Sequence, residues 1–160
     1  MKEFQSLAAF QAHIEKLIVE FPIYEKKAAN FLGEILVKEA RDKIGHLQEG
    51  WEKLKDSTKA DKEKKGYVFN ADYNPLYRTG QLRDSIHHVF NVESQTLFIG
   101  SDSEIMEYQE KGTKYIPARP VLSTTVYQAH PVINYVFGSM LKQYVSGEPL
   151  ALRKGTYGSL

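Results

Sequence analysis

The chain has 160 residues, a length typical of one domain with a substantial core. A formal net charge of +1 argues against a general nucleic-acid coat protein, which carries a large positive excess. The absence of cysteine excludes disulfides, thiol nucleophiles and thiolate metal sites. No apolar run approaches the roughly eighteen residues of a membrane span, and the N-terminus lacks a signal-peptide pattern. We therefore expect a protein made in the cytosol, or packed into a particle assembled there.

The first part of the chain has helical periodicity. Apolar residues recur in steps of three and four at Leu7, Phe10, Ile14, Leu17 and Phe21. This spacing predicts an amphipathic helix whose apolar stripe packs on the core. Pro22 interrupts the pattern and predicts the start of a second helix, which ends near Gly45.

Residues 46–66 lack any periodicity. Six lysines dominate residues 52–65, and the four carboxylates of that range, Glu52, Asp56, Asp61 and Glu63, offset part of their charge. We interpret residues 46–66 as a solvated, flexible loop. The alternative is a flexible arm that orders against a neighbouring subunit or a phosphate backbone, with Trp51 as its anchor. Residues 67–73 could pair as a strand before a turn at Asn74-Pro75.

A β-hairpin is predicted over residues 85–100. Apolar and polar side chains alternate in 85–92, so Ile86, His88, Phe90 and Val92 share one face. A turn at 93–95 leads to a return strand at 96–100. Next, a short helix is predicted from Ser101-Asp102 to Glu110, with Tyr108 packing inward.

The stretch after this helix is predicted to be stiff and free of helix. Gly112 can supply the positive φ that ends a helix. Pro117 and Pro120 then hold the chain extended, because each fixes its own φ and restricts the preceding residue. We call residues 112–120 the arm. A stiff arm loses little conformational entropy on docking, so it suits recognition better than chemistry.

Three motifs in this order resemble a known family. They are Trp51-x-x-Leu54 followed by Thr58 and lysines, then Leu76 to Ile86 with Thr79-Gly80-x-Leu82-x-x-Ser85-Ile86, and finally Tyr108-Gln109-x-x-Gly112-Thr113 with Ile116-Pro117-Ala118-Arg119-Pro120 and Leu122. Together they resemble the virion morphogenesis, tail completion or head–tail joining proteins of tailed bacteriophages. Val121 stands where that family usually has Phe, and the motifs cover residues 51–122 only.

The resemblance implies a structural protein of a phage or prophage. Such proteins form rings at the head–tail or tail-end interface, assembled in the host cytoplasm and retained in the virion. The signature positions expected at a partner or subunit interface are Tyr108, Gly112, Thr113, Tyr115, Pro117, Arg119, Pro120 and Trp51. Arg119 is expected to make a bidentate contact to a partner, or alternatively to act as an internal strut to a carboxylate such as Glu110.

The expected fold class is α+β. A small antiparallel sheet near 85–100 is expected to pack against long N-terminal helices and a C-terminal helix. The helical spacing of apolar residues in the C-terminal part begins at Leu122, and Pro131 predicts a kink or a break near His130. We expect one domain over residues 1–145 and a flexible tail over 146–160, in which Arg153, Lys154 and Tyr157 are available to a partner.

No catalytic motif is evident. His87 and His88 lie beside Asp84, but adjacent strand residues point to opposite faces and cannot share one metal. We therefore expect no enzyme activity, metal, cofactor, small-molecule substrate or membrane association. The principal alternative is a small nucleic-acid-binding protein that uses the 52–65 lysines and Arg153-Lys154, although DNA contact is not predicted. A metal-dependent hydrolase around Asp84 and the histidines is a remote third reading.

Overall fold

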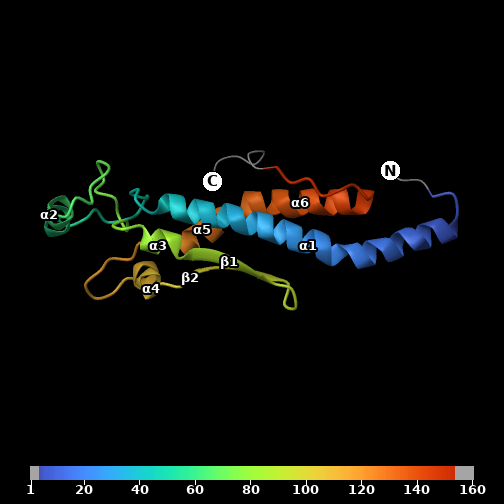
Figure 1. Ribbon diagram of the computed structural model, residues 1–160, viewed down its shortest axis with the longest axis horizontal. Helices are drawn as coiled ribbons and strands as arrows, with labels where there is room; N and C mark the ends of the chain where they lie inside the picture. The colour runs from blue at the N-terminus through green and yellow to red at the C-terminus, as the bar shows by residue number, and fades with distance from the viewer. Residues whose placement is uncertain (1–3, 154–160) are drawn as a thin grey trace. The chain divides into compact units, whose positions relative to one another are not determined.

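The computed structural model describes residues 4–153 and has an α+β fold, as the sequence predicted. Six helices and one antiparallel hairpin follow one another along the chain (Figure 1). Their bounds are α1 Leu7–Lys43, α2 Asp56–Lys64, α3 Gln81–Asp84, β1 Ile86–Asn91, β2 Thr96–Ser101, α4 Glu104–Lys111, α5 Leu122–Gln128 and α6 His130–Ser146.

The described elements belong to two compact units. Among the described residues, unit 1 comprises 4–33, 89–98 and 129–153, and unit 2 comprises 34–88 and 99–128. The first part of α1, the hairpin tip and α6 belong to unit 1. The last part of α1 belongs to unit 2, together with α2, α3, α4, α5 and the two hairpin ends.

The predicted break at Pro22 is wrong, because α1 continues through it as one helix of 37 residues. An interior proline removes one backbone hydrogen bond and costs roughly 3 kcal/mol. Contacts with α6 stabilise the helix beside it. The rings of Phe21 and Tyr24 lie 5.3 and 5.5 Å from the ring of Tyr144, whose hydroxyl donates to the Leu17 carbonyl at 2.6 Å.

The core of unit 1 is formed by small and branched side chains. Ala28, Ala29 and Leu32 of α1 are buried, as are Val132, Val136 and Met140 of α6. In Figure 1, α6 (red) lies along the middle of α1, while the first turns of α1 (blue) extend past its end. The predicted core-facing stripe is therefore wrong for these turns: Leu7, Phe10 and Ile14 are exposed.

The core of unit 2 gathers residues from distant parts of the sequence. Val37, Ala40 and Ile44 of α1 pack with Trp51, Leu82, Ile86, Met106 and Val121. Arg41 strengthens this arrangement by donating hydrogen bonds to the carbonyls of Arg83, Asp84 and Ile86, at the end of α3 and the start of β1. A basic side chain suits the carboxyl end of a helix.

The predicted hairpin and the predicted break near His130 are both confirmed. Burial alternates along β1, with Ile86 buried, His87 exposed and His88 half-buried. The chain leaves α5 at Gln128 and begins α6 at His130, with Pro131 in the first turn, where its missing N–H costs little.

The segment 46–66 differs from its prediction as a loop. It contains α2, whose lysines pair with carboxylates one turn away: Lys59 with Asp56 at 2.8 Å and Lys65 with Asp61 at 2.7 Å. Such pairs support a helix that has no apolar periodicity.

The strand expected at 67–73 is also absent from the described chain. The Asn74 side chain instead accepts hydrogen bonds from the backbone N–H groups of Phe69 and Asn70, and folds the segment into a loop.

Candidate functional site

A pocket of about 1060 Å³ lies in the described part of unit 2. Its walls come from residues 52–55, α2, the loop 76–80, α3, the start of α4 and the arm. The pocket therefore draws on all three sequence motifs that carry the phage resemblance.

The charged residues of the pocket lining are mainly cations. Six basic side chains face two carboxylates, Glu52 and Asp102; the basic residues are Lys53, Lys55, Lys62, Lys65, Arg78 and Arg119. Arg78 and Lys65 are both paired with Asp61, which leaves less of their charge for a ligand. Lys53 and Lys55 make no ion pair within residues 4–153 and are exposed.

Lys62 has a structural role in the wall. It is 3% exposed, and its ammonium group donates to the carbonyls of Asn74 at 2.8 Å and Tyr77 at 2.6 Å. Burial lowers the pKa of Lys62 from its ordinary value, and the nearby Arg78 lowers it further. The lysine thus fastens α2 to the loop that precedes α3.

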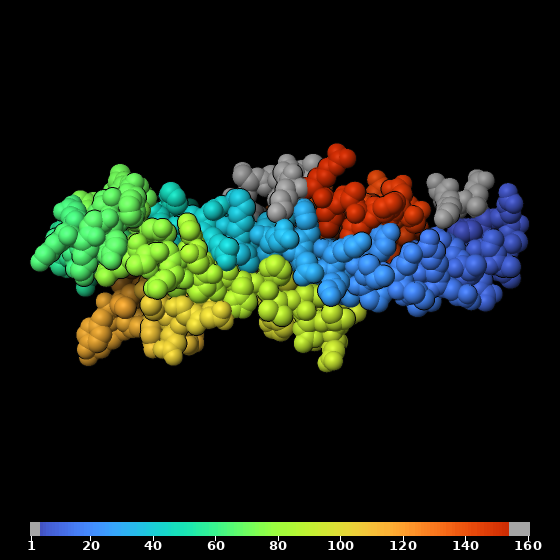
Figure 2. All heavy atoms as spheres, in the orientation of Figure 1, coloured from blue at the N-terminus to red at the C-terminus, as the bar shows by residue number. Residues whose placement is uncertain are grey.

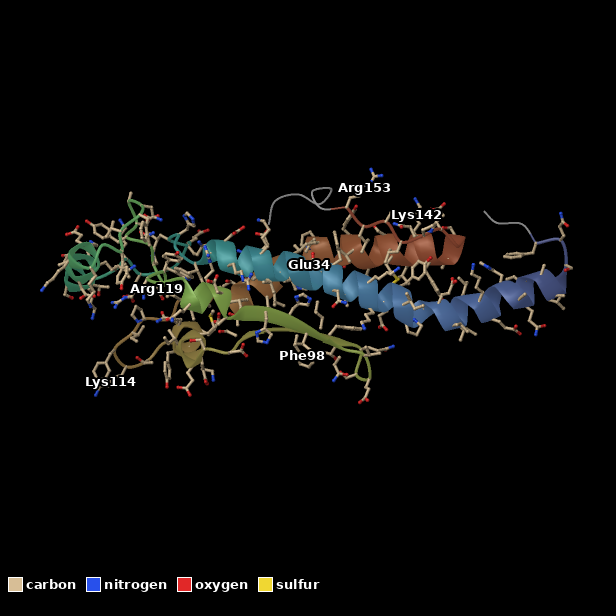
Figure 3. The ribbon with its side chains drawn as sticks, in the orientation of Figure 1. Glu34, Phe98, Lys114, Arg119, Lys142 and Arg153 are labelled. Carbon is tan, nitrogen blue, oxygen red and sulfur yellow. The ribbon has the colours of Figure 1, made fainter. Side chains whose placement is uncertain are left out.

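Arg119 lies inside the protein at the inner end of the arm. It is only 7% exposed, and its Nη2 group donates to the Glu52 carbonyl at 3.0 Å (Figure 3). Its Nε is buried and has no hydrogen-bond partner in the described chain. Burial lowers the pKa of the guanidinium, which nevertheless stays charged at neutral pH.

A second unpartnered polar atom lies on the same wall. The Oε1 atom of Gln109 is buried without a partner among the described residues, and both Gln109 and Arg119 line the pocket. The two residues also meet through their backbones, since the Arg119 N–H donates to the Gln109 carbonyl at 2.6 Å. Both residues thus belong to the pocket wall, and each holds one polar atom that is shielded from solvent and has no partner among the described residues.

The turn that opens the arm is built by Gly112 and Thr113. Gly112 has φ of +71°, and a Cβ added there would lie 2.8 Å from the backbone nitrogen of Ala118. The Thr113 hydroxyl accepts from the N–H groups of Tyr115 and Ile116, and the Thr113 N–H donates to the Ile116 carbonyl at 2.8 Å. These two signature positions shape the arm from within.

Glu110, rather than forming an ion pair with Arg119, caps helix α5. Its carboxylate accepts from the backbone N–H groups of Val121, Leu122 and Ser123, and from the Ser123 hydroxyl at 2.7 Å. The Glu110 strut expected for Arg119 is therefore wrong. Sequence reasoning missed the cap because Glu110 lies eleven to thirteen residues before its partners, outside any local capping pattern.

The other signature residues divide between surface and interior. Tyr115 is 78% exposed and Tyr108 is also exposed, so the predicted inward packing of Tyr108 is wrong. Pro117 lines the pocket and Pro120 is half-buried. Trp51 is 8% exposed and belongs to the core of unit 2, so it does not anchor a solvated arm.

Unit 1 carries a different candidate surface. Leu7, Phe10, Ile14 and Ile18 recur in steps of three and four along α1 and are all exposed, Leu7 by 82% and Ile18 by 67%. Residues at this spacing lie on one face of a helix. We call these four residues the α1 stripe. Figure 2 shows this end of α1 (blue) extending past the spheres of α6 (red).

The described residues contain no group of three acidic or histidine side chains that could hold a metal ion. None of the described helices is both long enough and apolar enough to cross a membrane. Arg153 is described, whereas Lys154 and Tyr157, predicted to be available to a partner, lie outside the described residues.

Comparison with known proteins adds no assignment: no family model, curated protein or solved structure matches this chain.

Proposed function

We propose that the chain is a structural protein of a tailed bacteriophage or prophage that acts in tail completion or head–tail joining by forming a ring-like oligomer. The resemblance of residues 51–122 to the phage family suggests the setting. The α1 stripe is the structural observation that carries the assembly role.

The stripe favours assembly because it leaves large apolar side chains in water. Isolated exposed apolar residues are normal on a protein surface, but four on one helical face form a continuous strip. Burying one Leu or Ile side chain contributes about 1.5–3 kcal/mol. A helix with an uncovered apolar face is suited to dock against a helix or groove of another subunit.

A second copy of the chain is the partner we propose for the stripe. Rings arise when one surface of a subunit binds a different surface of the next and the rotation closes. Two separate sets of exposed apolar residues in unit 1 are candidates for this different surface. They are Val89, Val92 and Phe98 on the hairpin and Leu141 and Val145 on α6.

The paired lysines of α2 weigh against the nucleic-acid alternative. Lys59 and Lys65 are engaged by carboxylates, and Lys62 is buried. Only part of the formal charge of this stretch is therefore available to phosphates, on which such binding depends.

The test is sedimentation velocity of two matched double variants. Leu7→Ser with Ile18→Ser removes two stripe residues, while Ala8→Ser with Ala12→Ser adds the same hydroxyls at exposed positions away from the stripe. Losing two apolar contacts weakens an interface by about 3–6 kcal/mol, which raises its dissociation constant at least a hundredfold. We expect only the stripe variant to dissociate.

Circular dichroism must show the same helicity for both variants. If the stripe variant sediments like the wild type, or if both variants dissociate equally, the stripe is not the assembly surface.

A further inference from the structure

We propose that the unit 2 pocket is a binding site for an extended, acidic peptide segment of a partner protein. The site lies on unit 2, whereas the α1 stripe lies on unit 1, so this proposal does not depend on self-assembly. Two buried polar atoms without partners in the described chain lie in residues of the pocket wall.

Buried polar atoms without partners are rare in folded proteins, and each calls for an explanation. Arg119 Nε–H is a donor and Gln109 Oε1 is an acceptor, and both belong to residues that line the same pocket. The Arg119 side chain is held in place by burial and by its bond to the Glu52 carbonyl. Both atoms are shielded in this structure, so a ligand reaches them only when the covering side chains move aside, and it must then carry an acceptor for Arg119 and a donor for Gln109.

The peptide backbone offers this combination. A carbonyl can accept from Arg119 Nε–H, and an amide N–H can donate to Gln109 Oε1. A phosphate diester has acceptors only, so a nucleic acid would need a base edge as well as its backbone to satisfy both atoms. A peptide carries both groups in its backbone, and its side chains can add the acidic and apolar groups that the rest of the lining complements.

The charge of the pocket indicates which side chains the peptide carries. The lining holds six cations against two carboxylates, and Asp61, outside the lining, pairs with two of the cations, Lys65 and Arg78. Among these cations, Lys53 and Lys55 are exposed and make no ion pair in the described chain. They directly follow Glu52, whose backbone carbonyl accepts a hydrogen bond from Arg119. Acidic side chains beside the bound backbone complement them, and opposite charges also speed the encounter.

Apolar side chains of the pocket complete the recognition. Ile105 and Ile116 line it and remain 54% and 36% exposed, and Pro117 lies next to Ile116. These residues can receive apolar side chains of the peptide. In an extended chain successive side chains point to opposite sides, so a segment that alternates acidic and apolar residues fits the pocket.

The arm is a suitable wall for such a site because it is preorganised. Its turn is fixed by Thr113 and Gly112, and its inner end is tied to α4 by the Arg119 N–H bond to the Gln109 carbonyl. Preformed walls reduce the entropy lost on binding.

The experiment is a titration followed by backbone amide shifts in two-dimensional NMR. The probe is a blocked hexapeptide of alternating Glu and Leu, compared with the same peptide in which Gln replaces Glu, and with a short oligothymidylate. We expect saturable shifts in residues 76–82 and 105–119 with the Glu-Leu peptide, at least tenfold weaker binding of the Gln-Leu peptide, and none of the oligonucleotide.

Three variants locate the site. Gln109→Leu removes the unsatisfied acceptor, and Lys53→Gln with Lys55→Gln removes two cations; we expect each to weaken binding about five- to tenfold. Lys114→Gln is the matched control, since Lys114 is an exposed cation at the outer end of the arm and outside the pocket lining (Figure 3).

Circular dichroism establishes that each variant is folded. The proposal is overturned if the Glu-Leu peptide gives no saturable shifts, if the oligonucleotide binds at the pocket in its place, or if Lys114→Gln weakens binding as much as the pocket variants do. A monomeric protein that still binds the Glu-Leu peptide at the pocket supports this site while refuting the ring.

Discussion

Replacing Glu110 tests how the arm is connected to the fold. Its carboxylate accepts from three backbone N–H groups at the start of α5 and from one hydroxyl. Two of these donors, the N–H groups of Val121 and Leu122, are partly buried. Each partly buried donor left without a partner costs about 1–2 kcal/mol. We therefore expect Glu110→Ala to lower the free energy of unfolding by about 2–4 kcal/mol, a large part of an ordinary domain's total of about 5–15 kcal/mol.

Urea unfolding followed by circular dichroism measures this loss as a lower midpoint with an unchanged slope. Glu110→Gln keeps one oxygen acceptor but loses the charge, so it should fall between the wild type and Glu110→Ala. Glu107→Gln is the control on the same helix. Glu107 is exposed, and its carboxylate accepts from the Lys111 ammonium group one turn later in α4. A midpoint for Glu110→Ala equal to that of Glu107→Gln refutes the capping role.

Two further variants test the arm and the pocket wall. Gly112→Ala should lower the free energy of unfolding by about 2–5 kcal/mol, because of the positive φ and the close backbone approach at this position. Gly138→Ala, in open space on α6, should raise it by up to about 1 kcal/mol in the same urea unfolding experiment. A loss at both positions contradicts the close approach. Lys62→Met should lower the free energy of unfolding by about 1–3 kcal/mol, because the carbonyls of Asn74 and Tyr77 lose their donor. Burial lowers the pKa of Lys62 in the folded protein below its ordinary value of 10.5. Between these two pKa values the folded wild type binds fewer protons than the unfolded chain. Its free energy of unfolding should therefore rise with pH in this window, relative to that of Lys62→Met. A difference between the two proteins that does not change up to pH 10.5 contradicts this account.

Elements with a strong local pattern were predictable from the sequence. Alternation along 86–91 and a short turn determined the hairpin, and Pro131 marked the break before α6. Helix α4 overlaps the helix predicted from Ser101-Asp102 to Glu110 and ends just before Gly112, although it begins only at Glu104 because Ser101 is the last residue of β2. In these cases the residues that decide the structure are near one another in the sequence.

The errors arose where distant contacts outweigh local preference. Pro22 alone predicts a break, but the ring contacts with Tyr144, more than 120 residues later, stabilise α1 around it. Helix α2 has no apolar stripe, and it is supported by ion pairs and by Lys62, which fastens it to a later loop.

The site was predictable in part. The sequence identified the arm and its signature residues, and the glycine turn at Gly112 has the positive φ expected of it. It did not reveal that Arg119 points inward, because its partner, the Glu52 carbonyl, lies 67 residues earlier. Nor could it show that Gln109 and Arg119 share one pocket, since only the folded chain brings their side chains together with Lys53 and Lys55.

Native mass spectrometry of the wild-type chain over a concentration series tests the proposed assembly most directly. A closed ring has a fixed number of subunits, so the account predicts one discrete oligomer whose stoichiometry stays constant as the protein concentration rises. A monomer at every concentration, or an open series of species that grows with concentration, would contradict it.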